Sequence, residues 1–348
     1  MKKTFCLLII LFLAVPLIFA KGGGETGSAR SRNARDKIVI YTSMYEDAID
    51  AVRSDLQRQF PAYDIEFVFG GTGIIQSRVS VEQAAGRLGC DILMVAEPAY
   101  SLELKEKGML HAFRYRDASS LAFDYDPQGY WYPVRVSNMV LAFNPERNSR
   151  NAVPSSFNDF AHDDRARGAI SMRNPLVSGT TMAAATALRD KYGYTYFEAL
   201  GRQRVKIDYG TDETLRKLET GECRVVMVLE ESILRARQIS NSRLEVIYPT
   251  DGTIVIPSTI MVINDQWSAN RNSAGAEAIA EWFLNTEGQN AIVASWMHSV
   301  RKDFPRNPHG SRPIAQIREN SIPVIWDNVY RERDDIRRRF EELAVAAR

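Results

Sequence analysis

Short β-rich runs alternate with amphipathic helical stretches in the first hundred residues, and this alternation restricts the fold more than any other feature. Residues 37–41 and 64–69 are rich in Ile, Val and Phe, whereas apolar residues within 46–60 recur at the spacing of a helix. The glycine-rich break at 70–73, a helical stretch to about Ala85 and the apolar run 91–95 continue the pattern. The chain is therefore predicted to be α/β, with a mainly parallel sheet flanked by helices.

The second half of the chain repeats the alternation without repeating the sequence. The pattern predicts strands at 139–143, 169–172 and 225–229, helices at 194–200 and 211–220, and a crossing strand at 254–262. Ligands of such sheets bind outside the carboxyl ends of the strands. The loops that follow the strands are therefore the first places to search for a site.

The N-terminus has the features of an export signal. A charged start is followed by the apolar run 5–19 and by the small residue Ala20, which predicts a signal peptide over 1–20. Cys6 lies inside the apolar run rather than at the cleavage point, so we expect no lipid anchor. Residues 21–36 are polar and glycine-rich, which indicates a disordered leader.

Length and composition narrow the function further. About 310 residues follow the leader, more than one core usually supports, so two lobes are expected. The charge is balanced, with 44 Lys+Arg against 43 Asp+Glu, and no basic stripe favours nucleic acid. After processing, Cys90 and Cys223 permit one disulfide or two buried thiols. The histidines lack the short spacing of metal ligands; they are His111, His162, His298 and His309.

The loop Ser178-Gly179-Thr180-Thr181 opens a helical stretch rich in alanine. Backbone N–H groups and hydroxyls at the positive end of a helix dipole are suited to binding an oxyanion. The alternative is an ordinary Ser or Thr N-cap. We interpret the loop as a candidate anion-binding site.

Other strand ends supply weaker candidates. Glu230 follows the strand at 225–229, where it can accept hydrogen bonds from a ligand or, with Glu231, simply stabilise the start of the next helix. Asp208 lies in another strand-end loop. The first half of the chain adds the possible donors Ser43, Thr72 and Gly73. The aromatic run 130–133 is interpreted as hinge or core packing rather than as a sugar-stacking surface.

Four segments, found in a fixed order, carry a resemblance to a known family. They are the start 38–43, the loop 177–180, the segment 248–257 and the E-G-Q helix at 285–291. Together they resemble the periplasmic solute-binding proteins of ABC importers, in the branch that includes the ferric-ion-binding proteins.

This resemblance implies a type II periplasmic-binding-protein fold with two crossover strands forming a hinge. Lobe 1 would comprise 37–138 plus 252–300, and lobe 2 would comprise 139–251 plus 301–348. It also implies a monomer in the periplasm that binds a solute between its lobes, performs no chemistry and delivers the solute to the transmembrane subunits of an ABC permease.

The ligand is less well defined than the family. Ferric-binding members of the branch carry a Tyr-Tyr pair, hard oxygen donors suited to iron, where this chain has Glu230-Glu231-Ser232. Similar members that bind hexose phosphates or phosphonates have a single Glu there, so a small anionic solute of that kind is expected, with no cofactor. The alternative is ferric iron as the transported ligand, bound by Tyr45 and Glu97 with a synergistic anion.

A secreted hydrolase is a remote alternative. It would need a nucleophile with a positioned base, and Ser178 lacks the G-x-S-x-G pattern of a nucleophile elbow.

Overall fold

The computed structural model describes residues 36–346, and its strands join into one ten-stranded sheet. The main strand order is β2-β1-β3-β10-β5-β8-β6-β7, while β4 pairs with β10 and β9 with β5. The strands are β1 (Asp36–Thr42), β2 (Tyr63–Phe69), β3 (Ile92–Ala96), β4 (Leu110–His111), β5 (Tyr132–Phe143), β6 (Ile170–Arg173), β7 (Lys206–Asp208), β8 (Val225–Leu229), β9 (Glu245–Ile247) and β10 (Ile254–Ile263).

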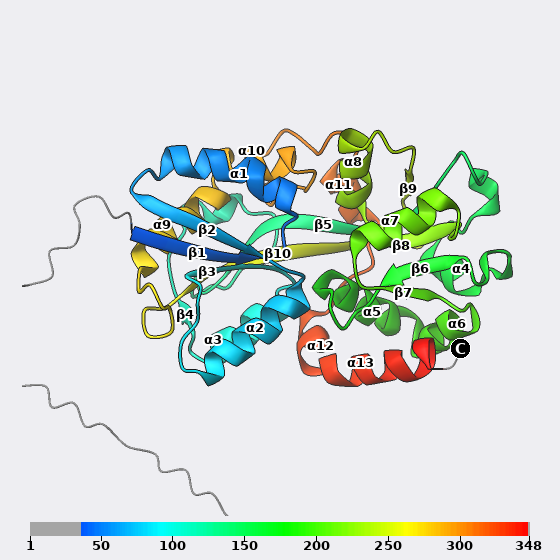
Figure 1. The fold of residues 1–348 in the computed structure, drawn as a ribbon, viewed down its shortest axis with the longest axis horizontal. Coiled ribbons are helices and arrows are strands. Elements are labelled where there is room, and N and C mark those ends of the chain that lie inside the picture. Colours follow the sequence, from blue (N-terminus) through cyan, green and yellow to red (C-terminus); the bar gives the residue numbers. More distant parts are fainter. Residues whose placement is uncertain (1–35, 347–348) are drawn as a thin grey trace, which may run out of the picture. The chain divides into compact units, whose positions relative to one another are not determined.

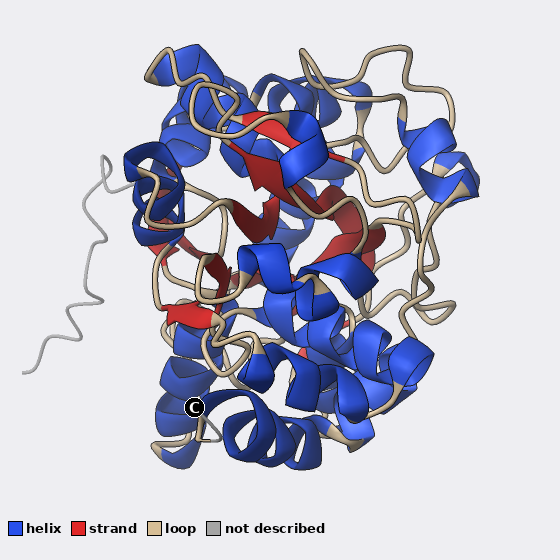
Figure 2. Ribbon diagram, turned by 90° about the vertical axis from the view of Figure 1, so that its right-hand side faces the viewer, coloured by secondary structure: helices blue, strands red, loops and turns tan. Residues whose placement is uncertain are grey.

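Helices cover both sides of this sheet (Figures 1 and 2). They are α1 (Glu46–Gln59), α2 (Thr72–Ala84), α3 (Ala99–Glu106), α4 (Phe157–His162), α5 (Gly179–Tyr192), α6 (Thr195–Arg202), α7 (Thr211–Thr220), α8 (Glu230–Ile239), α9 (Ser273–Leu284), α10 (Thr286–Ala294), α11 (Ile314–Glu319), α12 (Trp326–Arg331) and α13 (Arg333–Phe340). The predicted signal peptide and most of the leader lie outside the described residues. Asp36, which the sequence analysis assigns to the leader, is the first residue of β1.

The outer strands pair in parallel, as the alternation predicts, whereas two long central strands run antiparallel. β1 is parallel to β2 and β3, and β6 is parallel to β7 and β8. β5 and β10 are antiparallel to each other, and they also pair with β8 and β3 respectively. These two strands therefore connect the two parallel groups, which is the arrangement expected for crossover strands in a two-lobed fold.

Each parallel group is buried on both faces. Along β1, Ile38 and Ile40 pack into a cluster with α1, α9 and α10, while Val39 and Tyr41 pack into a second cluster with α2 and α3 (Figure 1). In the other group, one cluster includes α5, α6 and α13, and another includes α7 and α8. Burial on both faces explains why the inner strands β3 and β8 are continuous apolar runs.

The strand predicted at 139–143 is longer in the structure. It begins at Tyr132. The predicted range is too short because Arg135, Ser137 and Asn138 interrupt the apolar pattern, although all three residues are buried. Tyr132 packs its ring against Phe113 at a centroid distance of 4.9 Å. Its surroundings agree with the interpretation of this aromatic run as packing.

The two cysteines of the described range form no disulfide. Cys90 and Cys223 are free and buried, and they belong to different hydrophobic clusters. Within the same range, every helix is too short or too polar to span a lipid bilayer.

Candidate ligand-binding site

A cavity of about 320 Å³ lies where five helices begin. Residues at the starts of α1, α2, α5, α7 and α8 line it, and they come from both parallel groups of the sheet. Each helix start carries N–H groups without an intrahelical partner and the positive end of a helix dipole. Convergence of five such ends makes the cavity a favourable environment for a negative charge.

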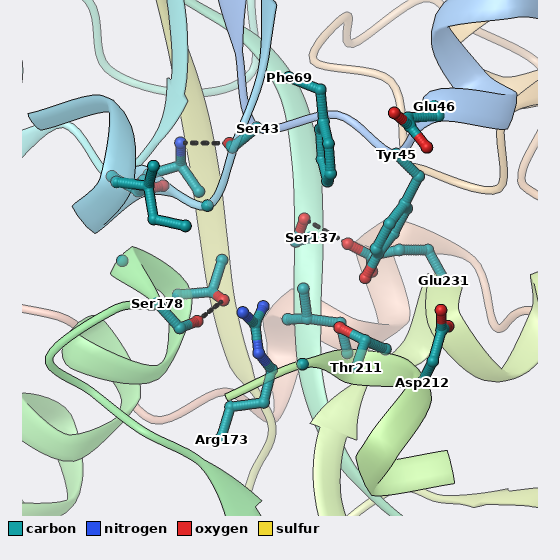
Figure 3. A pocket seen from close by; sticks show the side chains of 18 of the residues that line it. Ser43, Tyr45, Glu46, Phe69, Ser137, Arg173, Ser178, Thr211, Asp212 and Glu231 are labelled. Atoms are coloured by element: carbon teal, nitrogen blue, oxygen red, sulfur yellow. Dashed lines mark hydrogen bonds between the residues drawn. The ribbon is translucent and has the colours of Figure 1, made fainter. Parts of the chain in front are cut away.

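The start of α5 combines the two roles that the sequence analysis left open. Ser178 is the N-cap, and its Oγ accepts a hydrogen bond from the Thr181 N–H at 3.3 Å. The first intrahelical bond runs from Met182 N to Ser178 O at 2.9 Å, so the N–H groups of Gly179 and Thr180 precede it. Ser178, Gly179 and Thr180 also line the cavity (Figure 3). The loop is thus both a helix cap and a wall of the cavity.

Glycine is required at this helix start because the backbone of the other group lies very close. A Cβ at Gly179 would lie 2.6 Å from the Ala96 carbonyl oxygen and 2.8 Å from Thr72 Cβ. The Gly73 N–H donates to the Val177 carbonyl at 3.3 Å. The starts of α2 and α5 are therefore in direct contact at one side of the cavity.

Arg135, on β5, is a cavity residue that the sequence analysis missed. Its side chain is 3% exposed, and Nη2 donates to Ser43 Oγ at 3.0 Å while Nη1 contacts Met297 Sδ at 3.1 Å. Its Nε has no partner among residues 36–346. Burial disfavours the charged form and lowers the pKa of Arg135 to about 10, although Glu231 opposes this shift.

Arg173, at the end of β6, is the second guanidinium that the sequence analysis missed. Nη2 donates to the Tyr209 carbonyl at 3.3 Å, and the buried Nε has no partner within the described range. Figure 3 shows the guanidinium pointing into the cavity, between Ser178 and Thr211. Two arginines with incomplete hydrogen bonding therefore face the same space as the helix starts.

An acidic corner lies on the opposite side of the cavity in Figure 3. Glu231 accepts a hydrogen bond from Ser137 at 2.6 Å, and burial raises the pKa of its carboxyl group to about 7. Tyr45 is close by; its hydroxyl pairs with Ser232 Oγ at 2.7 Å, and burial raises its pKa. Since Tyr45 is the N-cap of α1 and Ser232 lies in α8, this bond also connects the two sides of the cavity.

The cavity contains five of the nine residues predicted to bind a ligand. Ser43, Thr72, Ser178, Gly179 and Thr180 line it, whereas Gly73, Thr181, Asp208 and Glu230 do not. Thr181 turns its hydroxyl to Ser178 Oγ at 2.9 Å. Asp208 is fully buried between Ser171 and Lys217, which donate to its two carboxylate oxygens.

Glu230 and Glu231 are adjacent on α8, and the structure turns the second one toward the cavity. Consecutive residues differ by about 100° around a helix, so one residue faces the cavity while its neighbour faces elsewhere. Glu230 accepts hydrogen bonds from Asn138 at 3.2 Å and from Tyr248, and its Oε2 lies 3.0 Å from His298 Nε2. Its carboxylate is thus occupied by protein partners.

The two residues proposed as alternative iron ligands are not brought together at the cavity. Tyr45 lines it, but Glu97 is buried outside it, accepts a hydrogen bond from Gln76 at 3.0 Å and lies 3.6 Å from Arg333. Across residues 36–346, no group of three or more His, Cys, Asp and Glu side chains is placed to hold a metal ion.

A signal for the missed arginines was present in the sequence. Arg135 interrupts the otherwise apolar run Val134-Arg135-Val136, and Arg173 directly follows the apolar residues of β6. A charged residue inside or at the end of a buried strand needs a functional or a structural partner. That argument identifies both positions as candidates without specifying what they face.

Comparison with known proteins agrees with the family resemblance. Residues 90–328 match the family model described as bacterial extracellular solute-binding protein. No curated protein matches the chain.

Several solved structures have a similar fold. Iron-bound HitA from Pseudomonas aeruginosa superposes with a TM-score of 0.76 at 17% identity, covering 89% of this chain and 99% of that one. The substrate-binding protein of an ABC transporter from Agrobacterium tumefaciens gives a TM-score of 0.79 at 17% identity, covering 91% and 96%. AfuA from Actinobacillus pleuropneumoniae, with fructose-6-phosphate bound, gives 0.76 at 17% identity, covering 88% and 98%.

Proposed function

Because the chain belongs to the bacterial extracellular solute-binding proteins, we propose that it captures a small anionic solute for an ABC importer. The solute class that we propose is a phosphorylated sugar or a phosphonate-like compound. The protein would act in the periplasm as a monomer and deliver its ligand to the transmembrane permease subunits. Binding, rather than catalysis, would be its role.

The observation that carries this proposal is the incomplete pairing of Arg135 and Arg173 in a cavity formed by helix starts. Arginine forms planar, bidentate hydrogen bonds with phosphoryl and carboxylate groups. The guanidinium Nε of each residue is buried without a partner in the described range. An oxyanion between these guanidinium groups and the N–H groups of Gly179 and Thr180 would satisfy donors that the protein leaves unpaired.

Cavity size supports an organic ligand. Binding sites for small molecules usually have volumes of about 300–1,000 Å³, and this cavity has about 320 Å³. Polar groups also line the wall opposite the α5 start, including Ser137 and Glu231. A sugar or an amine attached to the anionic group would find hydrogen-bond partners there.

We propose that ligand capture uses contacts that already join the two lobes, taken as 37–138 plus 252–300 and 139–251 plus 301–348. Tyr45 pairs with Ser232, Asp47 pairs with Arg235, and Gly73 donates to Val177. The first two contacts involve the cavity residues Tyr45, Asp47 and Arg235, and the third lies next in sequence to the cavity residues Thr72 and Ser178. Lobe opening would break them, and a ligand that bridges the lobes would favour their formation.

Ferric iron is the less favoured ligand. Similar structures include one with iron bound and one with fructose-6-phosphate bound, so fold similarity alone does not choose between them. Hard trivalent ions need several anionic oxygen donors. Carboxylates line this cavity, but none of those in residues 36–346 are grouped to hold a metal ion, Glu97 lies outside it, and three arginines line it. Positive charge repels a metal cation and attracts an oxyanion.

A thermal-shift panel tests the proposal. Purified protein would be heated with inorganic phosphate, glucose 6-phosphate, 2-aminoethylphosphonate, citrate or ferric citrate. A ligand present at about 100 times its Kd adds roughly 2.7 kcal/mol to the unfolding free energy. We expect stabilisation by at least one phosphorylated or phosphonate compound. Failure of all anions to stabilise the protein, or a red ferric complex that a chelator bleaches, would contradict it.

Catalysis is tested separately. We expect no turnover of generic phosphoester and peptide substrates by the purified protein. Turnover that Ser178→Ala abolishes would instead support a hydrolase.

A further inference from the structure

Two aromatic residues that the anion proposal does not use lie at opposite ends of the sheet and yet line the same cavity. Phe69 is the last residue of β2, and Tyr209 directly follows β7. β2 and β7 are the first and last strands in the sheet order. The sheet therefore curves so that both edge strands deliver an aromatic ring to one site.

Both rings are unusually exposed for their size. Phe69 is 47% exposed and Tyr209 is 67% exposed, and Ile74 beside them on α2 is 60% exposed. In β2, side chains alternate between the faces, and Phe67 on the same face as Phe69 packs against the core beside α1. Phe69 continues this apolar row, and Figure 3 shows its ring in the cavity.

Each aromatic residue is close in sequence to a group proposed to bind the anion. Tyr209 supplies the carbonyl that accepts the 3.3 Å hydrogen bond from Arg173, and Gly210, the N-cap of α7, follows it. Phe69 precedes the loop to Gly71, the N-cap of α2. A ligand whose anionic group contacts Arg173 and these helix starts would place the atoms next to that group against the two rings.

The ring faces at these positions offer no hydrogen-bond donor to an inorganic anion and no ligand to a metal ion; only the Tyr209 hydroxyl could do so. They are suited to a flat apolar surface, because an aromatic ring gains by burying its face against another ring or against C–H groups. We infer that the solute is an organic anion whose ring lies next to the anionic group and packs between Phe69 and Tyr209. This inference rests on the proposed function and narrows it to ring-bearing solutes.

Two kinds of ring have this chemistry, namely the C–H face of a cyclic sugar and an aromatic ring. Calorimetric titration with four probes distinguishes them. Inorganic phosphate has no organic group, and glycerol 3-phosphate has an acyclic one. Glucose 6-phosphate carries a sugar ring, and phenyl phosphate carries an aromatic ring. We expect at least one ring-bearing probe to bind 10-fold or more tightly than glycerol 3-phosphate.

Variants then locate the source of this preference. Phe69→Ala and Tyr209→Ala should each weaken the ring-bearing probe about 5- to 20-fold, while the affinity for inorganic phosphate changes less than 2-fold. Phe69→Tyr and Tyr209→Phe keep the rings and should restore the preference. Val81→Ala is a matched control, since Val81 is 72% exposed on α2 and does not line the cavity.

The outcomes distinguish failure of the ring inference from failure of the proposed function. If ring-bearing and acyclic probes bind equally, or if the alanine variants weaken inorganic phosphate as much as the ring-bearing probe, the inference is overturned and the proposed function stands. If the alanine variants bind every probe as the wild type does, the rings do not contact the solute, and the inference is again overturned. If no probe binds at all, the proposed function fails, and the inference fails with it.

Discussion

Two buried arginines, Arg135 in the cavity and Arg301 outside it, have opposite environments. Arg135 is 3% exposed and hydrogen-bonds with a serine hydroxyl and a methionine sulfur. Arg301 is 8% exposed and donates to the carboxylates of Asp117 and Asp303 and to the Tyr115 hydroxyl. Burial lowers the pKa of Arg135 to about 10, whereas the hydrogen bonds that Arg301 donates to Asp303 and Asp117 raise the pKa of Arg301.

This difference distinguishes a buried charged residue that stabilises the fold from one that is available to bind a ligand. A buried charge is tolerated when nearby groups of opposite charge compensate it. Arg301 has this compensation within the protein, so its role is to stabilise the fold. Arg135 lacks an equivalent partner in the described range and faces a cavity, so its compensation is expected from a bound anion.

Glu231 sharpens the comparison because its carboxylate acts on the Arg135 charge, and the largest stability effect is expected at this residue. Its folded pKa of about 7 lies above the ordinary glutamate value of 4.5, so the folded state binds the proton more tightly than the unfolded state. The stability that comes from this proton is present below about pH 4.5 and is lost as the pH rises through 7.

Glu231→Gln removes this loss. Relative to wild type, the variant should gain about 3 kcal/mol of unfolding free energy between pH 5 and pH 8. Urea unfolding at several pH values measures the difference. Glu281→Gln, at a partly buried acid on α9 outside the cavity, is the control and should change much less. A pH-independent difference would show that Glu231 is already ionised at pH 5.

Arg301→Met tests the other side of the comparison. Loss of its charged hydrogen bonds should lower the unfolding free energy by about 2 kcal/mol. Arg135→Met should lower it by less than this or raise it, because it removes a poorly compensated buried charge. Urea unfolding of the two variants at pH 7 gives both values. Equal destabilisation would break the distinction between the two sites.

The smallest effect is expected at the start of α5. Thr180→Ala removes one hydroxyl at the cavity and leaves the Ser178 cap intact, so anion binding should weaken by about 1 kcal/mol, or roughly 5-fold. Thr181→Ala is matched to it, because both threonine hydroxyls pair with Ser178 Oγ but only Thr180 lines the cavity. Calorimetry with the tightest anion of the panel compares them. A larger loss for Thr181→Ala would mean that helix capping, rather than direct contact, explains the effect.

The sequence predicts the parts of the fold that depend on local periodicity. The helices found at Glu46–Gln59 and Thr211–Thr220 and the strand found at Val225–Leu229 match the predicted ranges, because uninterrupted apolar spacing defines them. The first half of β5 was missed, since Arg135, Ser137 and Asn138 look like loop residues until the neighbouring strands are known.

The residues of the candidate site likewise fall into those that a local sequence pattern predicts and those that depend on the packing of the fold. Ser178, Gly179 and Thr180 were predicted because a helix start is a local pattern, and the structure places all three at the cavity. Which of Glu230 and Glu231 faces the cavity depends on the rotation of α8 about its axis. An error of one residue in the predicted start of the helix is enough to select the wrong glutamate. Arg135 becomes a candidate only when the sheet brings β5 beside the starts of five helices.

The most direct test of the account is calorimetric titration of wild type and Arg135→Met with the tightest-binding anion of the panel. Loss of a buried charged hydrogen-bond partner is expected to weaken binding by about 2 kcal/mol or more, which is roughly 30-fold. We expect this loss together with an unfolding free energy that rises, or that falls by less than it does in Arg301→Met. Unchanged affinity in the folded variant would contradict the claim that Arg135 binds the anion.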